Sequence, residues 1–189
     1  TPKPSSAASD VYKRQLLHRP LHLVPPEATA PPPRIRQQVA FVAAARKNAT
    51  LIALLRRDTP DRVMVFTRTK QASDSVARAL ESAGLSAAAL HGDHSQARRD
   101  RTLATFRRGT LRVLVATDVM ARGIDIDDVT LVVNYDIPEQ PETYIHRIGR
   151  TARAGRRGTA LSLCAPEERQ LLREIERQTS ARITAIDPT

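Results

Sequence analysis

The sequence has one cysteine, no tryptophan and few aromatic residues of any kind. Cys164 has no second cysteine to pair with, so an apolar core has to hold the fold together. A lone thiol is typical of proteins from a reducing compartment, and we expect a cytoplasmic location. An aromatic content of 3% also leaves few of the stacking platforms on which many proteins bind single-stranded nucleic acids.

Long apolar runs are also absent. No stretch approaches the roughly 18 apolar residues that a membrane-spanning helix needs, and we see no secretory signal. The chain has 189 residues, of which 41% are hydrophobic and 26% charged. That composition is typical of a globular protein, and the length suits one domain with a core of its own. We expect no membrane partner.

Lysine is scarce beside arginine. Of the 30 basic residues only four are lysines, namely Lys3, Lys13, Lys47 and Lys70. The net charge of +10 favours a polyanionic partner. An arginine-rich genome would produce the same bias, so charge alone does not choose a function.

The first 33 residues differ from the rest. The stretch Ser5–Gln15, SSAASDVYKRQ, is similar to the translation of a transposon-type sequencing adapter. We therefore hypothesise that residues 1–15 are a library artefact. Residues 16–33 look like the end of a preceding domain and a stiff proline-rich linker, PPEATAPPP. We expect residues 34–187 to form the domain.

Apolar strands alternate with helical segments along this domain. The expected strands are 63–66, 87–90, 113–116, 131–133, 159–163 and a short one at 183–186. The expected helices are 47–59, 71–82, 95–108, 141–149 and 167–178. This order predicts an α/β fold with a parallel sheet covered by helices on both faces. Ligands bind such folds at the carboxyl ends of the strands, at the loops 67–70, 91–96, 117–127 and 135–138.

The segment Tyr144–Gly155, YIHRIGRTARAG, carries the clearest chemistry. If the helix that begins at Pro141 continues, His146, Arg150 and Arg153 share one face at i, i+4 and i+7. Cations on one stripe repel each other unless an anion compensates them, and the guanidinium fork suits phosphate oxygens. A solvated basic face is the alternative.

HRIGRTARAG resembles the sixth conserved motif of DEAD-box RNA helicases. Three further stretches resemble motifs of that family in the same order: VMVFTRTK, HGDHSQARRD and VLVATDVMARGIDI. The resemblance implies a RecA-like (P-loop NTPase-like) fold and the C-terminal, second RecA-like domain of a bacterial-type DEAD-box ATP-dependent RNA helicase. His146, where many related DNA helicases carry glutamine, favours RNA. Ala152 departs from the glycine of many members, and we expect its methyl group to be tolerated.

The resemblance also implies roles for the ATP side. Arg150 and Arg153 would contact the γ-phosphate, with Arg153 as the arginine finger, and His146 would link the ATP state to the partner domain. Contacts on the adenosine side of ATP and coupling between the two domains would fall to Arg122, Gly123 and Asp125. A carboxylate suits a ribose hydroxyl, although a loop aspartate that caps a helix is the alternative for Asp125.

A second set of residues is expected to bind RNA through its backbone. Thr117 offers a small hydroxyl at a strand end, or else caps a helix. Gly92 lets a phosphate approach the backbone, or else is a plain turn glycine. Gln96 and Arg99 match the QxxR pattern of the family. Such contacts predict binding that tolerates any sequence and weakens with salt.

Two motifs of an ATPase are missing from the sequence. It contains no GxxxxGK[ST] phosphate loop and no DEAD-type acidic motif. We therefore expect ATP and Mg²⁺ to be held mainly by an N-terminal RecA-like domain, no metal site in this chain, and no ATPase activity of the chain alone. A DNA-acting superfamily 2 helicase or translocase and a stand-alone RNA-binding module are the alternatives.

Overall fold

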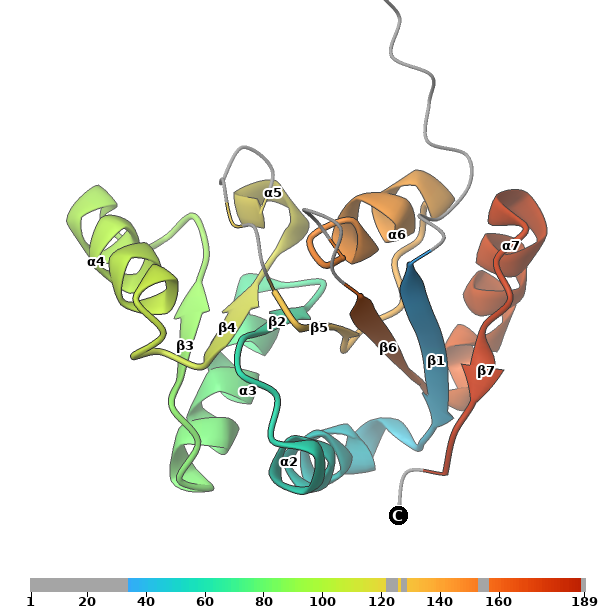
Figure 1. The fold of residues 1–189 in the computed structure, drawn as a ribbon, viewed down its shortest axis with the longest axis horizontal. Coiled ribbons are helices and arrows are strands. Elements are labelled where there is room, and N and C mark those ends of the chain that lie inside the picture. Colours follow the sequence, from blue (N-terminus) through green and yellow to red (C-terminus); the bar gives the residue numbers. More distant parts are fainter. Residues whose placement is uncertain (1–33, 122–125, 127–128, 153–156, 188–189) are drawn as a thin grey trace, which may run out of the picture.

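The computed structural model describes residues 34–121, 126, 129–152 and 157–187. These residues form a seven-stranded sheet with helices on both faces (Figure 1). Each pair of neighbouring strands is parallel. The expected α/β fold is thereby confirmed.

The strands follow the order β3-β4-β2-β5-β6-β1-β7 across the sheet. They are β1 Ile35–Phe41, β2 Val63–Phe66, β3 Ala87–Leu90, β4 Val113–Ala116, β5 Leu131–Asn134, β6 Gly158–Cys164 and β7 Thr184–Ala185. The helices are η1 Ala44–Arg46, α2 Lys47–Asp58, α3 Lys70–Ser82, α4 Gln96–Arg107, α5 Asp118–Ala121, α6 Pro141–Ile148, η2 Pro166–Glu168 and α7 Arg169–Thr179.

Strand β1 is the one long element that the sequence analysis missed. Its sequence, IRQQVAF, places Gln37 on the buried face between Ile35 and Val39. The hydroxyl of Tyr144 donates a hydrogen bond of 2.8 Å to the Gln37 side chain, which makes this burial tolerable. A buried glutamine interrupts the apolar pattern, so the strand cannot be recognised without its partner on α6.

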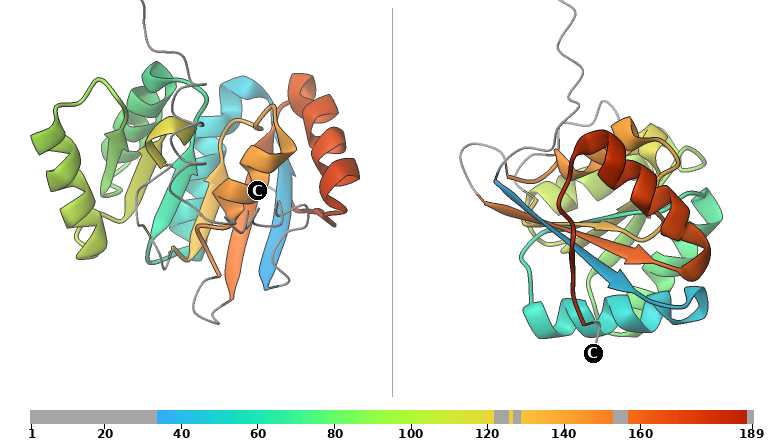
Figure 2. Two further views of the ribbon diagram at one scale, coloured as in Figure 1. Left: turned by 90° about the horizontal axis from the view of Figure 1, so that it is seen from above. Right: turned by 90° about the vertical axis from the view of Figure 1, so that its right-hand side faces the viewer.

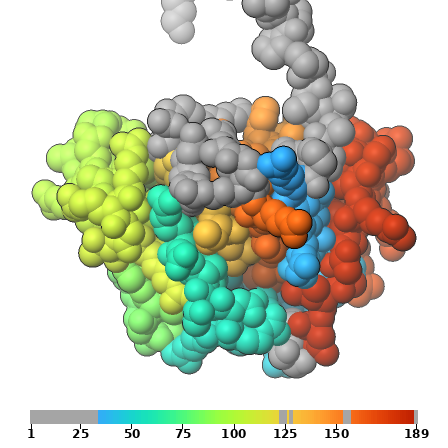
Figure 3. Space-filling view, in the orientation of Figure 1, coloured from blue at the N-terminus to red at the C-terminus, as the bar shows by residue number. Residues whose placement is uncertain are grey.

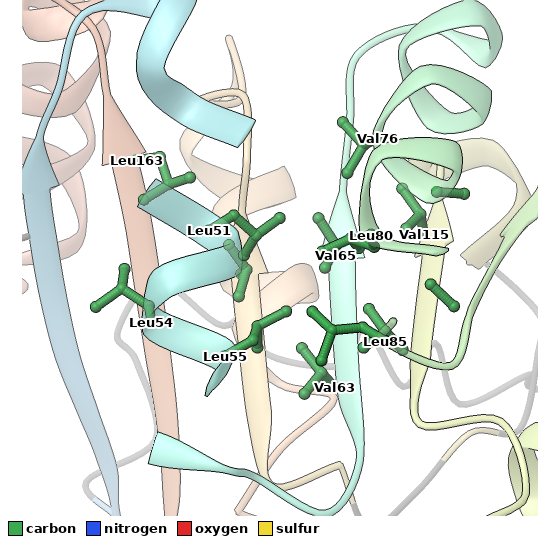
Figure 4. Packing of buried hydrophobic residues seen from close by; sticks show 14 of the residues in the cluster. Leu51, Leu54, Leu55, Val63, Val65, Val76, Leu80, Leu85, Val115 and Leu163 are labelled. Carbon is green, nitrogen blue, oxygen red and sulfur yellow. The ribbon is translucent and has the colours of Figure 1, made fainter. Parts of the chain in front are cut away.

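The two faces of the sheet bury alternate residues of the same strands. Val63 and Val65 of β2 pack with α2 and α3 on one face, where Leu51, Leu55 and Leu80 meet them (Figure 4). Met64 and Phe66 point to the opposite face, and Phe106 of α4 packs in their cluster. The side views show α2 and α7 on opposite sides of the sheet (Figure 2). Because helices cover both faces of the sheet, successive residues of central strands such as β2 and β4 are all buried. Such strands are therefore continuous apolar runs.

Helices α4 and α7 lie at opposite ends of the molecule, as the space-filling view shows (Figure 3). A separate apolar cluster is formed by α6 and α7 together with β1 and β6. Cys164 of β6 belongs to it, and burial raises the pKa of its thiol to about 11. Within the described part of the chain, no helix combines the length and apolar character that a bilayer crossing requires.

The turn that leads toward β6 is tightly constrained. Ala152 has a left-handed backbone with φ of 58°, and the Thr151 hydroxyl beside it donates to the Val129 carbonyl. A Cβ atom on Gly158 would lie 2.1 Å from Thr151 Oγ1, so the two chain segments touch at a distance that only glycine allows. The left-handed conformation of Ala152 ends any continuation of α6.

Replacing Ala152 with glycine is expected to stabilise the domain. A left-handed conformation costs an ordinary residue about 1–2 kcal/mol, whereas glycine adds about 0.5–1 kcal/mol of entropy loss on folding. The free energy of unfolding in urea should therefore rise by about 0.5–1 kcal/mol. Ala79→Gly, in the middle of α3, is the control and should lower it by a similar amount. A loss of stability in Ala152→Gly would contradict the argument.

Candidate functional site

The carboxyl ends of the parallel strands form the candidate site. The loops after β2, β3, β4 and β5 all leave the sheet at this edge. Helix α5 begins directly after Thr117, and α6 packs close by through Arg147, which bonds to Asp118 of α5. Side chains from segments far apart in the sequence thus meet at one edge, as expected for this class of fold.

Arg147 is the central side chain of the edge, although it is only 2% exposed. Its Nε and Nη2 donate to the two carboxylate oxygens of Asp118 at 2.6 and 2.8 Å. Its Nη1 donates to the Asn134 side chain at 3.2 Å and to the Asp136 carbonyl at 2.7 Å. The guanidinium also stacks over the Phe66 ring, 5.2 Å from its centre. Arg147 is therefore committed to joining α6, α5 and β5.

Arg147 lies between the candidates His146 and Arg150 but was not itself predicted to be a functional residue. The signal that could have revealed it is helical spacing. Arg147 follows Tyr144 by three positions and precedes Ile148, and both are fully buried. An arginine on the apolar stripe of a helix is expected to reach an acidic partner inside the protein.

A second buried cation supports the loop after β5. Lys47 Nζ donates to Glu168 Oε2 and to the Tyr135 carbonyl, both at 2.6 Å. Glu168 accepts in addition from the backbone N–H groups of Ile137 and Ala165, each at 3.0 Å. Both partners of the ion pair also make hydrogen bonds to backbone groups. The pair therefore fixes the backbone of this loop relative to α2 and η2.

The phenol of Tyr135 belongs to the same region. Its hydroxyl donates to Asn48 Oδ1 at 3.1 Å, and Lys47 Nζ lies 5.3 Å from its ring centre. Burial, assisted by the charges of Asp136 and Glu168, raises the pKa of Tyr135 to about 12. The hydroxyl is therefore protonated at neutral pH and acts as a fixed hydrogen-bond donor.

Arg68 lines an open cavity of about 230 Å³ beside this loop. Its backbone N–H donates to Asp136 Oδ2 at 2.8 Å, and its side chain is 50% exposed. Pro138, Gln140 and Thr143 line the same cavity. The guanidinium donates to the Ile137 carbonyl at 3.4 Å and lies 3.8 Å from Glu168 Oε1, and its exposed half can attract an anion.

His146 and Arg150 line one shallow pocket with Thr143. They do not share a helical stripe as predicted, because α6 ends at Ile148. The N–H groups of Arg150 and Thr151 donate instead to Arg147 and Ile148, three residues back, at 3.1 Å. The chain then turns left-handed at Ala152. The prediction that the helix continues is thus wrong. The tight turn nevertheless keeps His146 and Arg150 at the same pocket.

Four candidate residues lie outside the described residues, and their positions are not assigned. They are Arg122, Gly123, Asp125 and Arg153.

The residues proposed for RNA lie on the first turn of α4, in the loop before α4 and directly before α5. Arg99 Nη1 lies 3.8 Å from Met120 Sδ, which places α4 against α5. Gln96 is exposed and donates to Asp100 at 2.8 Å. Thr117 precedes α5, and its backbone carbonyl accepts from Met120 and Ala121 at 3.2 and 3.1 Å. Gly92 has room for a Cβ atom, so local packing does not require a glycine there.

Two histidines stand beside this group. His91 Nε2 and Asp74 Oδ1 are 3.0 Å apart, and the ring centres of His91 and His94 are 3.9 Å apart. The hydrogen bond with His91 lowers the pKa of Asp74. Burial, followed by the positive charges of His91 and Arg98, lowers the pKa of His94. Neither histidine was predicted from the sequence to be functional.

Comparison with known proteins identifies close relatives. Residues 46–155 match the family described as "Helicase conserved C-terminal domain". The DEAD-box ATP-dependent RNA helicase CshA of Bacillus subtilis (strain 168) is 45% identical over 156 residues, which are 82% of this chain and 32% of that protein. The chain thus spans about a third of the length of the curated relatives it matches.

Solved structures agree with this similarity. The E. coli DEAD-box protein SrmB, solved bound to regulator of ribonuclease activity A, is 40% identical with a TM-score of 0.78. The match covers 82% of this chain and 92% of that one. The S. cerevisiae protein Dbp5 bound to RNA and ADP BeF3 gives a TM-score of 0.81 at 32% identity, over 98% of this chain and 50% of that one. The RecA-like fold is thereby confirmed.

Removing the Arg147 side chain is expected to destabilise the domain strongly. Arg147→Ala leaves the carboxylate of Asp118 and the Asp136 carbonyl without their donor, and breaking a buried ion pair costs about 3–5 kcal/mol. Because Asp118 is partly exposed, we expect a loss of about 3 kcal/mol in urea unfolding. His146→Ala, on the exposed face of the same helix, is the control and should change stability by less than about 0.5 kcal/mol. Equal effects of the two substitutions would contradict the assigned role.

Proposed function

The chain belongs to the DEAD-box family, in which it is the helicase conserved C-terminal domain, and we propose that it supplies one half of an ATP-driven RNA helicase site. The observation that carries the proposal is the grouping of His146 and Arg150 at one pocket of the carboxyl edge. The domain comprises residues 34–187, and residues 16–33 connect it to an N-terminal RecA-like domain. We further propose that the complete protein acts in the cytoplasm.

On the ATP side, this domain contributes cations rather than a complete nucleotide site. Arg150 and Arg153 reach the γ-phosphate of ATP held by the N-terminal domain, and Arg153 is the arginine finger. A guanidinium stabilises the charge that develops on the transferring phosphoryl group. Arg122, Gly123 and Asp125 contact the adenosine side, and His146 senses the state of the nucleotide.

The buried Arg147 supports this arrangement by holding α6 in place. Four hydrogen bonds fix its guanidinium to α5 and to the end of β5. His146 precedes Arg147 directly and Arg150 follows it by three positions, so the backbone that carries both is held in place. Preorganised charge is effective in catalysis because little energy is spent on reorienting it.

Mg²⁺ fits the other domain better than this one. Three carboxylates at this edge of the sheet are already engaged by cations. Asp118 pairs with Arg147, Glu168 pairs with Lys47, and Asp136 lies 3.7 Å from Lys47. A carboxylate shared with a buried cation is a poor ligand for a hard metal ion. The proposed site therefore receives Mg²⁺ with the phosphates, from the N-terminal domain.

RNA binds across α4, α5 and the loop before α4. Gln96 and Arg99 face the backbone from the first turns of α4, while Thr117 and Gly92 approach it from neighbouring strand ends. Contact between Arg99 and Met120 supports one continuous surface. These groups address phosphates and sugars, so binding tolerates any sequence.

The ATPase proposal can be tested in the complete protein and in the chain alone. A chimera in which residues 34–187 replace the matching domain of B. subtilis CshA serves if the complete gene is not in hand. Arg153→Ala should lower RNA-stimulated turnover about 10³–10⁵-fold while ATP affinity is retained. Arg173→Ala on α7 is the charge-matched control and should turn over normally. Residues 34–187 alone should show no turnover above buffer.

ATP hydrolysis by the isolated chain, or equal turnover of the Arg153→Ala and Arg173→Ala proteins, would sink the proposal. Stimulation by DNA as strong as that by RNA would instead indicate a DNA-acting helicase or translocase. A complete gene without a phosphate-loop motif would indicate a stand-alone RNA-binding module.

The RNA surface can be tested by comparing two arginines of α4. Arg99→Ala in the complete protein should weaken binding equally for two single-stranded RNAs of unrelated sequence, and should reduce the slope of log K against log salt by about one. Arg101→Ala removes the same charge from another face of the helix and should have a smaller effect. Equal losses of RNA affinity in both variants would show that Arg99 acts only through the general positive field of the domain.

A further inference from the structure

Asp74, His91 and His94 come together from three different segments. Asp74 lies on α3, His91 follows the last residue of β3, and His94 lies in the loop before α4. The Nε2 atoms of His91 and His94 are 3.0 and 3.9 Å from the same carboxylate oxygen, Asp74 Oδ1. One ligand atom from each residue lies within 4.8 Å of the other two. Neither ATP nor RNA contacts proposed above use these three side chains.

The two imidazoles are buried and incompletely satisfied. His91 is 3% exposed and His94 is 9% exposed. The Nδ1 atom of each ring is buried without a hydrogen-bond partner among the described residues. Buried polar atoms are normally paired, so both rings keep capacity for a ligand beyond the contact of their Nε2 atoms with Asp74.

We propose that Asp74, His91 and His94 form a binding site for a divalent transition-metal ion of the Zn²⁺ type. Two imidazoles and one carboxylate are a common three-residue set for zinc, and the ion keeps a further position for water. The Asp74 side chain is 35% exposed, which leaves the site open to solvent on that side. Small movements of the side chains bring the three donors to coordination distance.

The donor set also predicts which ions bind. Imidazole nitrogen suits Zn²⁺, Co²⁺ and Ni²⁺, whereas Mg²⁺ and Ca²⁺ prefer oxygen ligands. The charges of Arg78 and Arg98 act on Asp74 and His94. Their positive charge opposes every divalent ion alike, so the preference among ions comes from the imidazole ligands.

Metal binding at this place would fix the loop that leads into α4. The bound ion joins α3 to both ends of the segment His91–His94, and the unfolded chain does not hold these residues together. Binding therefore stabilises the folded protein. The site is independent of the proposed function, because its occupancy can be measured without ATP or RNA.

The test is titration of the full chain with ZnCl2 by calorimetry at pH 7.5. All proteins carry His18→Asn and His22→Asn, which remove two further histidines from the N-terminal segment. We expect about one equivalent of Zn²⁺ to bind, and Co²⁺ to give the visible absorption of a low-symmetry site. His94→Asn and, separately, Asp74→Asn should each weaken Zn²⁺ binding at least about tenfold.

Asp93→Asn is the matched control, because Asp93 lies between the two histidines but pairs with Lys70 at 2.6 Å. It should leave the affinity for Zn²⁺ within about twofold of the parent. Circular dichroism and melting in EDTA confirm that each variant is folded. No Zn²⁺ binding, binding unchanged in both folded variants, or equal binding of Mg²⁺ would overturn the proposal.

Discussion

The guanidinium of Arg147 is buried, and a buried charge is tolerated only if its hydrogen-bonding groups find partners. Asp118 supplies a carboxylate, while Asn134 and the Asp136 carbonyl accept the remaining bonds. Those partners come from the start of α5 and from the end of β5. One side chain thereby sets how α6 lies on the sheet, and the positions of His146 and Arg150 depend on it.

Lys47 and Glu168 perform the same task for the neighbouring loop. Their ion pair holds the backbone that follows β5 from two points, because Lys47 donates to the Tyr135 carbonyl and Glu168 accepts from the Ile137 N–H group. The cations of this edge thus divide into two kinds. Arg147 and Lys47 are buried and organise loops, whereas Arg68 is half exposed and faces a cavity. Of these three cations, Arg68 is the one that an anionic ligand can reach, although it also lies 3.8 Å from Glu168.

Much of the fold could be predicted because both faces of the sheet are covered. Strands β2, β3 and β4 are continuous apolar runs, and they begin and end where the pattern places them. Strand β1 could not be recognised, because Gln37 interrupts its apolar face and becomes compatible with burial only through Tyr144. The extension of α6 was wrong for a related reason. Thr151 is held by Val129, a contact with a distant part of the chain.

The sequence alone determined most of the strands and helices along the chain, the family to which the chain belongs, and the edge of the sheet at which the motifs that resemble those of the family meet. These follow from local apolar patterns and from motifs that are contiguous in the chain. Only the tertiary structure decided which arginine of HRIGR is buried, and which histidines lie beside Asp74. Burial and pairing are set by residues far apart in sequence, so neighbouring arginines of equal chemistry acquire different roles.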